Sequence, residues 1–179
     1  NGGDCSALQD QLRNVQQIQA TANAFAAILP DGSVVAWGHP DSGGTCCAVR
    51  DQLKDVQQIQ ATKHAFSAIL ADGSVVSWGD PDWGGDCYAV QDQLQNVKKI
   101  QATAGAFAAI LADGSVVSWG DPDCGGDCSA LKDKLRHVQH IQATGNSFAA
   151  ILEDGSVVAW GHPRCGGDCS AVRDCLKYL

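Results

Sequence analysis

The segment AFAAILADGSVVSWG, residues 106–120, carries the clearest structural signal in the chain. Two apolar runs flank an Asp-Gly pair, and glycine adopts a positive φ there without a Cβ clash, so the segment predicts a β-hairpin. Both predicted strands are apolar on both faces, as in strands that neighbouring sheets cover on both sides. We therefore expect another sheet on each side of this hairpin.

The hairpin belongs to a repeat, because the sequence is self-similar with a constant period of 41 residues and no insertions. The recurring positions include a tryptophan (Trp37, Trp78, Trp119, Trp160), a phenylalanine (Phe25, Phe66, Phe107, Phe148), an Asp-Gly pair that begins at Asp31, Asp72, Asp113 or Asp154, a cysteine (Cys5, Cys46, Cys87, Cys128, Cys169) and an aspartate (Asp10, Asp51, Asp92, Asp133, Asp174). We expect a single repeat domain over residues 1–179, with units at approximately 1–38, 39–79, 80–120 and 121–161 and a C-terminal capping segment at 162–179.

A further strand is predicted before each hairpin. VQQIQAT, residues 15–21, is rich in residues that favour β-structure, and a short connection joins it to the first hairpin. The third residue of that connection belongs to a type that tolerates a left-handed backbone. In the four units it is Asn23, His64, Gly105 or Asn146. We expect a turn role for His64 rather than a ligand or catalytic role.

A short helix is predicted between successive hairpins. DCSALQDQLRN, residues 4–14, offers Asp4 or Ser6 as an N-cap and has apolar residues on one face, which predicts a helix of about two turns. The unit is then strand, β-hairpin, loop and short helix. The fold class is a mainly β tandem repeat array with short helices.

The composition excludes several kinds of partner. The 20 acidic residues exceed the 12 Lys and Arg, and the net charge of −8 repels phosphate backbones and anionic membranes, so nucleic acid is excluded as a direct partner. No apolar run approaches the roughly 18 residues that span a bilayer, so we expect no direct membrane insertion. The chain has no methionine and nine cysteines. We expect it to be processed from a precursor or longer chain and to reside in an oxidising or organellar compartment.

Two of the loops contain a second cysteine. Cys124 and Cys165 each precede a recurring cysteine in Cys-Gly-Gly-Asp-Cys. The loop is flexible enough to join Cys124 to Cys128 and Cys165 to Cys169, and each disulfide would add about 2 kcal/mol of stability. Reduced thiols are the alternative. The sequence does not set the pairing of the remaining cysteines, Cys5, Cys46, Cys47, Cys87 and Cys175.

Metal sites and catalytic motifs are not indicated. The Cx3C spacing differs from that of structural zinc sites, and only His162 lies nearby. The aspartates of DPDWGGD, residues 80–86, and of DPDCGGD, residues 121–127, lack the bidentate Glu of a calcium loop, so we expect them to cap turns. No nucleophile elbow, Walker loop or HExxH motif is present. We expect a non-enzymatic protein without a metal or other cofactor.

Residues taken from the four units, position by position, give the run VQQIQATANAFAAILADGSVVSWG. This run resembles the RCC1-like repeat family, whose repeat has a β-rich segment, a turn, an apolar strand, a D-G turn and a strand ending in W-G. The resemblance covers about 24 of every 41 residues, and similar short-period arrays occur in algal RCC1-like or HERC-like proteins. The family's unit is usually longer and seven blades usually close into a propeller. For four units we expect a partial or small propeller, or an open superhelix.

The resemblance implies a platform that binds partner proteins through loops and blade faces. The family's exchange activity depends on loop features that are not matched in this chain, and its chromatin contact depends on positive charge that this acidic chain lacks. Regulation of a small GTPase therefore stays an alternative by fold analogy alone. A redox or metal-responsive protein that uses the Cx3C loops is the other alternative.

We expect selectivity to lie in the departures from the repeat, since the units are otherwise similar. The partner-binding candidates are Trp83, Tyr88, Lys98, Lys99, His137, His140 and Arg164. Trp83 suits contact with a partner protein or a pigment, or a local lid over the hairpin. The favoured function is an interaction or structural scaffold in a larger assembly. In an alga, an extrinsic subunit of a photosynthetic complex is a candidate.

Overall fold

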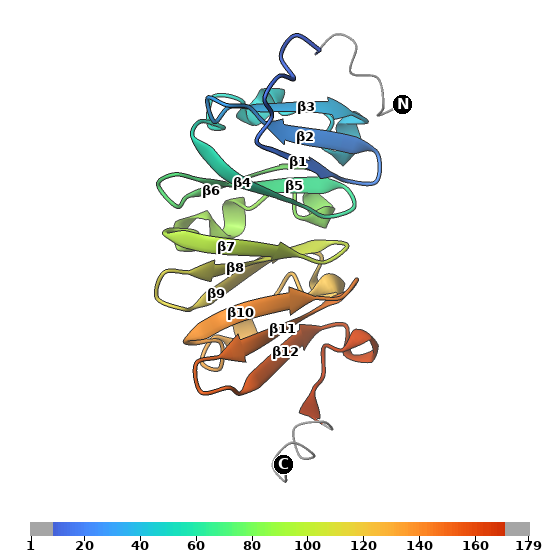
Figure 1. Ribbon diagram of the computed structural model, residues 1–179. Coiled ribbons are helices and arrows are strands. Elements are labelled where there is room, and N and C mark those ends of the chain that lie inside the picture. The colour runs from blue at the N-terminus through green and yellow to red at the C-terminus, as the bar shows by residue number, and fades with distance from the viewer. Residues whose placement is uncertain (1–8, 171–179) are drawn as a thin grey trace.

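The computed structural model describes residues 9–170, which form four three-stranded antiparallel sheets (Figure 1). In each sheet the strands follow chain order, so the predicted strand and the predicted hairpin pair into one meander. The strands are β1 (Gln17–Ala20), β2 (Ala24–Ile28) and β3 (Val34–Gly38); β4 (Val56–Ala61), β5 (Ala65–Leu70) and β6 (Val75–Gly79); β7 (Val97–Ala102), β8 (Ala106–Leu111) and β9 (Val116–Gly120); and β10 (Val138–Ala143), β11 (Ser147–Leu152) and β12 (Val157–Gly161). The mainly β repeat fold is confirmed.

The sheets stack in chain order, with β1–β3 at one end of the stack and β10–β12 at the other (Figure 1). They do not close into a ring, which agrees with a partial propeller. Each of the two middle hairpins has one face toward the preceding sheet and one toward the following sheet. In the second hairpin, Ile69 packs with Ile100 of the next sheet, whereas Phe66 packs with Ile28 of the sheet before.

The recurring aromatic residues lie within the hairpins. Each phenylalanine is the cross-strand partner of a tryptophan, as in Phe107 and Trp119, whose stacked rings have centroids 5.4 Å apart. The indole Nε1 of Trp119 also donates a hydrogen bond to the carbonyl of Gly84 in the preceding loop, at 3.2 Å. The aromatic pair therefore joins the two strands of one hairpin and also fixes the loop that precedes its sheet.

The connections between sheets contain only short helices. The predicted helix appears as the 3₁₀ helices η3 (Cys47–Val49), η5 (Tyr88–Gln93) and η7 (Ser129–Leu131), two of which are a single turn. The prediction of about two turns was too long for η3 and η7 and fits η5. The leucine that follows each helix, Leu53, Leu94 or Leu135, is buried. The copy at residues 4–14 lies partly outside the described residues.

A second 3₁₀ turn follows the last strand of each sheet. These turns are η2 (Pro40–Ser42), η4 (Pro81–Trp83), η6 (Pro122–Cys124) and η8 (Pro163–Cys165). The Asp80 and Asp121 carboxylates accept hydrogen bonds from the backbone N–H of Asp82 and Asp123, at 3.0 and 2.9 Å. The predicted capping role of these aspartates is confirmed.

The predicted left-handed turn residues were misplaced. Asn23, His64, Gly105 and Asn146 do lie in the turns between the first and second strands, but their φ values are not positive. Thr62 closes that turn instead, because its hydroxyl accepts a hydrogen bond from the Ala65 N–H at 3.0 Å. The described non-glycine residues with positive φ precede the first strand of each sheet: Asn14, Asp55, Asn96 and His137, with φ of 53° to 56°.

Candidate partner-binding site

Four of the seven partner-binding candidates gather around one surface cavity. Lys98 and Lys99 lie in β7, His140 lies in β10, and His137 directly precedes β10. All four line a cavity of about 570 Å³. Two acidic residues, Asp113 and Glu153, also line it, so with neutral histidines the formal charge of the lining is zero, against −8 for the whole chain. We call the cavity that Lys98, Lys99, His137 and His140 line the basic cavity, after these four side chains.

The repeat explains why these side chains meet. Lys99 and His140 are 41 residues apart and occupy the same position in consecutive units, where the first two units have Gln17 and Gln58. Stacking of the sheets turns one sequence position into a row of side chains. In the first unit, the Gln17 amide binds the next sheet directly: it donates to the Ile59 carbonyl and accepts from the Ile59 N–H, each at 3.0 Å.

Neighbouring groups hold part of the basic cavity in place. The Lys98 Nζ donates a hydrogen bond to the carbonyl of Ala112 at 3.2 Å. His137 Nδ1 lies 3.9 Å from Glu153 Oε2, and both side chains are largely exposed, so this contact is weak. Within residues 9–170, Lys99 and His140 have no side-chain hydrogen bond or ion pair. These two side chains are therefore available to a ligand.

Asp113 is occupied by its own turn. Its Oδ1 accepts hydrogen bonds from the backbone N–H and the hydroxyl of Ser115, at 2.9 and 2.6 Å. These bonds, the hydroxyl contributing most, lower the pKa of the Asp113 carboxyl below its ordinary value. The negatively charged Asp113 carboxylate is thus hydrogen-bonded within the hairpin turn.

A second cavity extends the basic surface. It has a volume of about 500 Å³, shares His137 with the basic cavity and is lined also by Lys132 and Arg136. The Lys132 Nζ donates to Gln93 Oε1 at 3.2 Å, and the Arg136 guanidinium lies 3.3 Å from Asp133. Both contacts are exposed, so positive charge continues from the third unit into the loop before the fourth.

The other three candidates lie elsewhere. Trp83 lines a groove of about 690 Å³ with the aspartates Asp82, Asp86, Asp121 and Asp127. Its ring contacts His64 edge-on, with centroids 4.7 Å apart, so Trp83 covers the turn between β4 and β5. Tyr88 is 85% exposed on η5, and Arg164 is exposed on η8. The sequence analysis did not identify Asp113 or Glu153 as part of a site.

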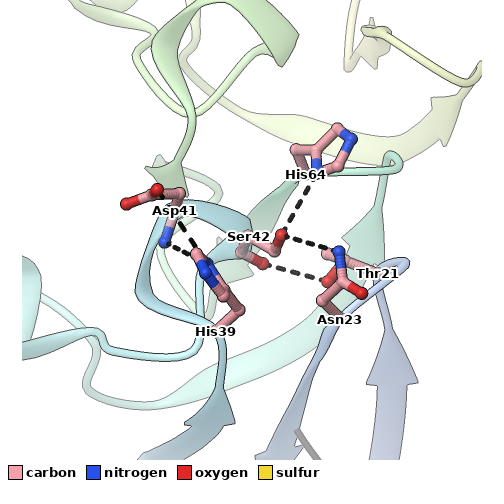
Figure 2. A network of polar contacts seen from close by, with 6 residues as sticks. All are labelled: Thr21, Asn23, His39, Asp41, Ser42 and His64. Carbon is pink, nitrogen blue, oxygen red and sulfur yellow. Dashed lines mark hydrogen bonds and ion pairs between the residues drawn. The ribbon is translucent and has the colours of Figure 1, made fainter. Parts of the chain in front are cut away.

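A polar network joins the first two units (Figure 2). The Ser42 hydroxyl lies 3.1 Å from His64 Nδ1 and 3.5 Å from the Asn23 amide, while the Thr21 hydroxyl donates to the Ser42 carbonyl at 3.0 Å. Ser42 is buried, and the carboxylate in the network, Asp41, faces His39 rather than His64. The Ser-His contact therefore links two turns, and this supports the structural role expected for His64.

The two predicted disulfides are not formed. Cys124, Cys128, Cys165 and Cys169 are all free thiols, as are Cys46, Cys47 and Cys87, whereas Cys5 and Cys175 lie outside the described residues. The physical reason is that the sulfur atoms form hydrogen bonds with neighbouring elements instead of bonding to each other. Cys124 Sγ accepts a hydrogen bond from the Asn146 amide of the next unit at 3.3 Å, and the Cys128 thiol donates to the Val116 carbonyl at 3.7 Å.

The chemistry of Cys124 follows from this burial. Desolvation, with a further contribution from Asp121, raises the pKa of the Cys124 thiol to about 11. A thiol with that pKa stays protonated at neutral pH and reacts slowly as a nucleophile. Among residues 9–170, no three His, Cys, Asp or Glu side chains are placed to hold a metal ion. In the same part of the chain, no helix is long and apolar enough to cross a bilayer.

Similarity to known proteins lies in the fold. No family model and no curated protein matches the sequence. Kap60-bound yeast RCC1 (Prp20) superposes with a TM-score of 0.60 and 18% identity, over 86% of this chain and 45% of that chain. Prp20p of Saccharomyces cerevisiae gives a TM-score of 0.60 and 19% identity, over 86% and 46%. The chain has the RCC1-like repeat fold.

A human structure extends this RCC1-like similarity. Human WBSCR16 superposes with a TM-score of 0.54 and 17% identity, over 82% of this chain and 47% of that chain. The RCC1-like chain thus spans about half the length of the solved structures that it matches. At these identities the similarity establishes the architecture, and the site has to be argued from this chain's own residues.

Proposed function

We propose that this RCC1-like chain is a protein-interaction scaffold whose basic cavity binds an acidic segment of a partner protein. The observation that carries the proposal is the convergence of Lys98, Lys99, His137 and His140 on one cavity. These four residues depart from the glutamines, asparagines and aspartate of the equivalent positions, so the site is specific to the third and fourth units.

Electrostatics favours a segment that contains several carboxylates. A lysine ammonium is a mobile point charge that pairs with carboxylate oxygens, and two adjacent lysines suit two acidic side chains better than one. The net charge of −8 repels acidic partners from most of the surface. An acidic segment is therefore guided toward a region where lysine and histidine side chains cluster beside a hollow.

The fold similarity supports the class of function. One yeast structure shows RCC1 (Prp20) with Kap60 bound, and the other concerns Prp20p and its binding properties to Gsp1p and histones. Those are protein partners of the yeast protein, and they favour protein binding by this chain as well. Regulation of a small GTPase rests on fold analogy alone. The high pKa of Cys124 argues against fast thiol chemistry in the third loop.

Fluorescence anisotropy with a labelled hexaglutamate peptide tests the proposal. The double variant Lys99→Gln/His140→Gln restores the residue that the first two units carry, so the fold is retained. Its affinity for the peptide should fall about tenfold, or about 1.4 kcal/mol, and added salt should weaken binding to the original chain. Lys63→Gln is the matched control, because it removes one exposed lysine from a turn outside the cavity.

The control variant should bind the peptide nearly as well as the original chain. Equal loss in both variants would show that only overall charge matters, and unchanged affinity in the double variant would place binding elsewhere. Either result contradicts the proposed site.

A further inference from the structure

The groove beside Trp83 has a charged lining of one sign. The loops that follow β6 and β9 line this groove of about 690 Å³, and its charged residues are the aspartates Asp82, Asp86, Asp121 and Asp127. Among the described residues, no lysine, arginine or histidine lines it. We call this hollow the acidic groove. Its lining therefore attracts a cationic group.

The aspartates of the acidic groove keep acceptor capacity for a ligand. Asp86 Oδ1 accepts a hydrogen bond from the Tyr88 backbone N–H, and Asp127 Oδ1 accepts one from the backbone N–H two residues on, both at 2.8 Å. Each of these bonds uses one carboxylate oxygen. Within residues 9–170, none of the four aspartates of the acidic groove forms an ion pair. Since a carboxylate offers about four acceptor positions, most of them are open to a ligand.

Trp83 adds an aromatic surface to the acidic groove. Its side chain is half-buried and lines the groove, whereas the equivalent residues in the neighbouring units, Ser42 and Cys124, are small. An indole face attracts cations, and a guanidinium both stacks on an aromatic ring and pairs with carboxylates. In the described part of the chain, no three His, Cys, Asp or Glu side chains are placed to hold a metal ion. The acidic groove therefore suits an arginine side chain better than a metal ion.

Ser118, in β9, gives an independent indication of a ligand. It lines the acidic groove and is 6% exposed, and among the described residues its hydroxyl has no hydrogen-bond partner. In the preceding sheet the equivalent Ser77 hydroxyl donates to the Ser67 hydroxyl at 3.2 Å, but Ala108 replaces that partner in the third unit. Buried hydroxyls are rarely left unpaired, so we expect a group that enters the groove to bind Ser118.

We propose that the acidic groove binds an arginine-containing basic segment of a partner protein. An arginine of the segment lies on Trp83, the aspartates accept hydrogen bonds from its cations, and one of its N–H groups donates to the Ser118 hydroxyl. The acidic groove and the basic cavity share no lining residue. The inference therefore does not rest on the proposed function, and it gives the chain a second site that selects the opposite charge.

Fluorescence anisotropy with a labelled tetra-arginine peptide tests this inference. The variant Trp83→Ser/Asp86→Thr converts PDWGGD, residues 81–86, into the PDSGGT of residues 40–45. The first loop of the chain already has this sequence, so the variant should fold, which circular dichroism checks. We expect its affinity for the peptide to fall at least about tenfold, because it loses the indole and one carboxylate.

A second variant tests the unpaired hydroxyl. Ser118→Ala introduces the residue that Ala36 and Ala159 provide at the equivalent positions, so the sheet tolerates it. Its affinity for tetra-arginine should fall about fivefold, since a hydrogen bond to a charged group is lost. Asp51→Asn is the control, because it removes one exposed negative charge outside the acidic groove. This control should bind the peptide nearly as well as the original chain.

Three results would overturn the inference: no binding of tetra-arginine to the original chain, unchanged affinity in either groove variant, or an equal loss in the control. Hexaglutamate should bind the loop variant as it binds the original chain, because the basic cavity is intact in both. A failure of the acidic groove is therefore distinguishable from a failure of the basic cavity.

Discussion

One residue before each sheet has a left-handed backbone, and this position joins the fold to the proposed site. Asn14, Asp55 and Asn96 hold it in the first three units, with side chains that tolerate this conformation. In the fourth unit the residue is His137, with φ 56°, and it lines the basic cavity. The fourth unit therefore keeps a residue type that tolerates this backbone, and the same residue brings an imidazole to the proposed site.

The cost of that backbone can be measured at Asn96, whose side chain has no hydrogen bond among the described residues. We expect Asn96→Gly to leave the free energy of unfolding nearly unchanged, because glycine has no Cβ to clash. Asn96→Ala should lower it by about 1 kcal/mol. Urea unfolding followed by circular dichroism provides both values. An equal loss in the two variants would show that the asparagine side chain matters rather than φ.

At the scale of elements, the contact between successive sheets stabilises the array. Each internal contact combines apolar side chains from two units, a backbone bond between their turns and a glycine that lies against the next unit. Within residues 9–170, the outer face of the last sheet has the same residues without that cover. The chain therefore contains its own comparison between a formed contact and an open one.

The glycines Gly114 and Gly155 make this comparison with one substitution. Both have φ +79°, so replacement by alanine strains the backbone to a similar extent. Only at Gly114 does the new Cβ also meet the His137 backbone. We expect Gly114→Ala to lower the free energy of unfolding by at least about 1 kcal/mol more than Gly155→Ala. Thermal or urea unfolding of the two variants checks this, and equal losses would contradict the stacked contact.

The features that could be predicted from the sequence are local ones. The hairpin follows from Asp-Gly between apolar runs, and the period follows from the tryptophan and phenylalanine positions. The state of Cys124 could not be predicted, because Asn146 of the next unit contacts its sulfur. Trp83 was equally ambiguous, since only the folded turn brings His64 to its ring. Predictions failed or stayed open where a neighbouring unit sets the outcome.

At the scale of the whole molecule, an acidic array carries a basic cavity across its third and fourth units. The period already placed Lys99 and His140 in one column, and stacking makes such a column a row of neighbours. The sequence did not show that Lys98 and His137 line the same cavity, because this depends on the path of the chain between the sheets. Similar units thus build the support, and a few departures from the repeat supply the proposed binding site.

Amide NMR spectra recorded during titration with hexaglutamate locate binding on the molecule. We predict that the peptide shifts the resonances of residues 98–99, 111–114 and 137–140, which line or adjoin the basic cavity, and that Lys99→Gln/His140→Gln removes these shifts. Shifts centred on the groove of Trp83, or spread over all four units, would contradict a partner-binding site at the basic cavity.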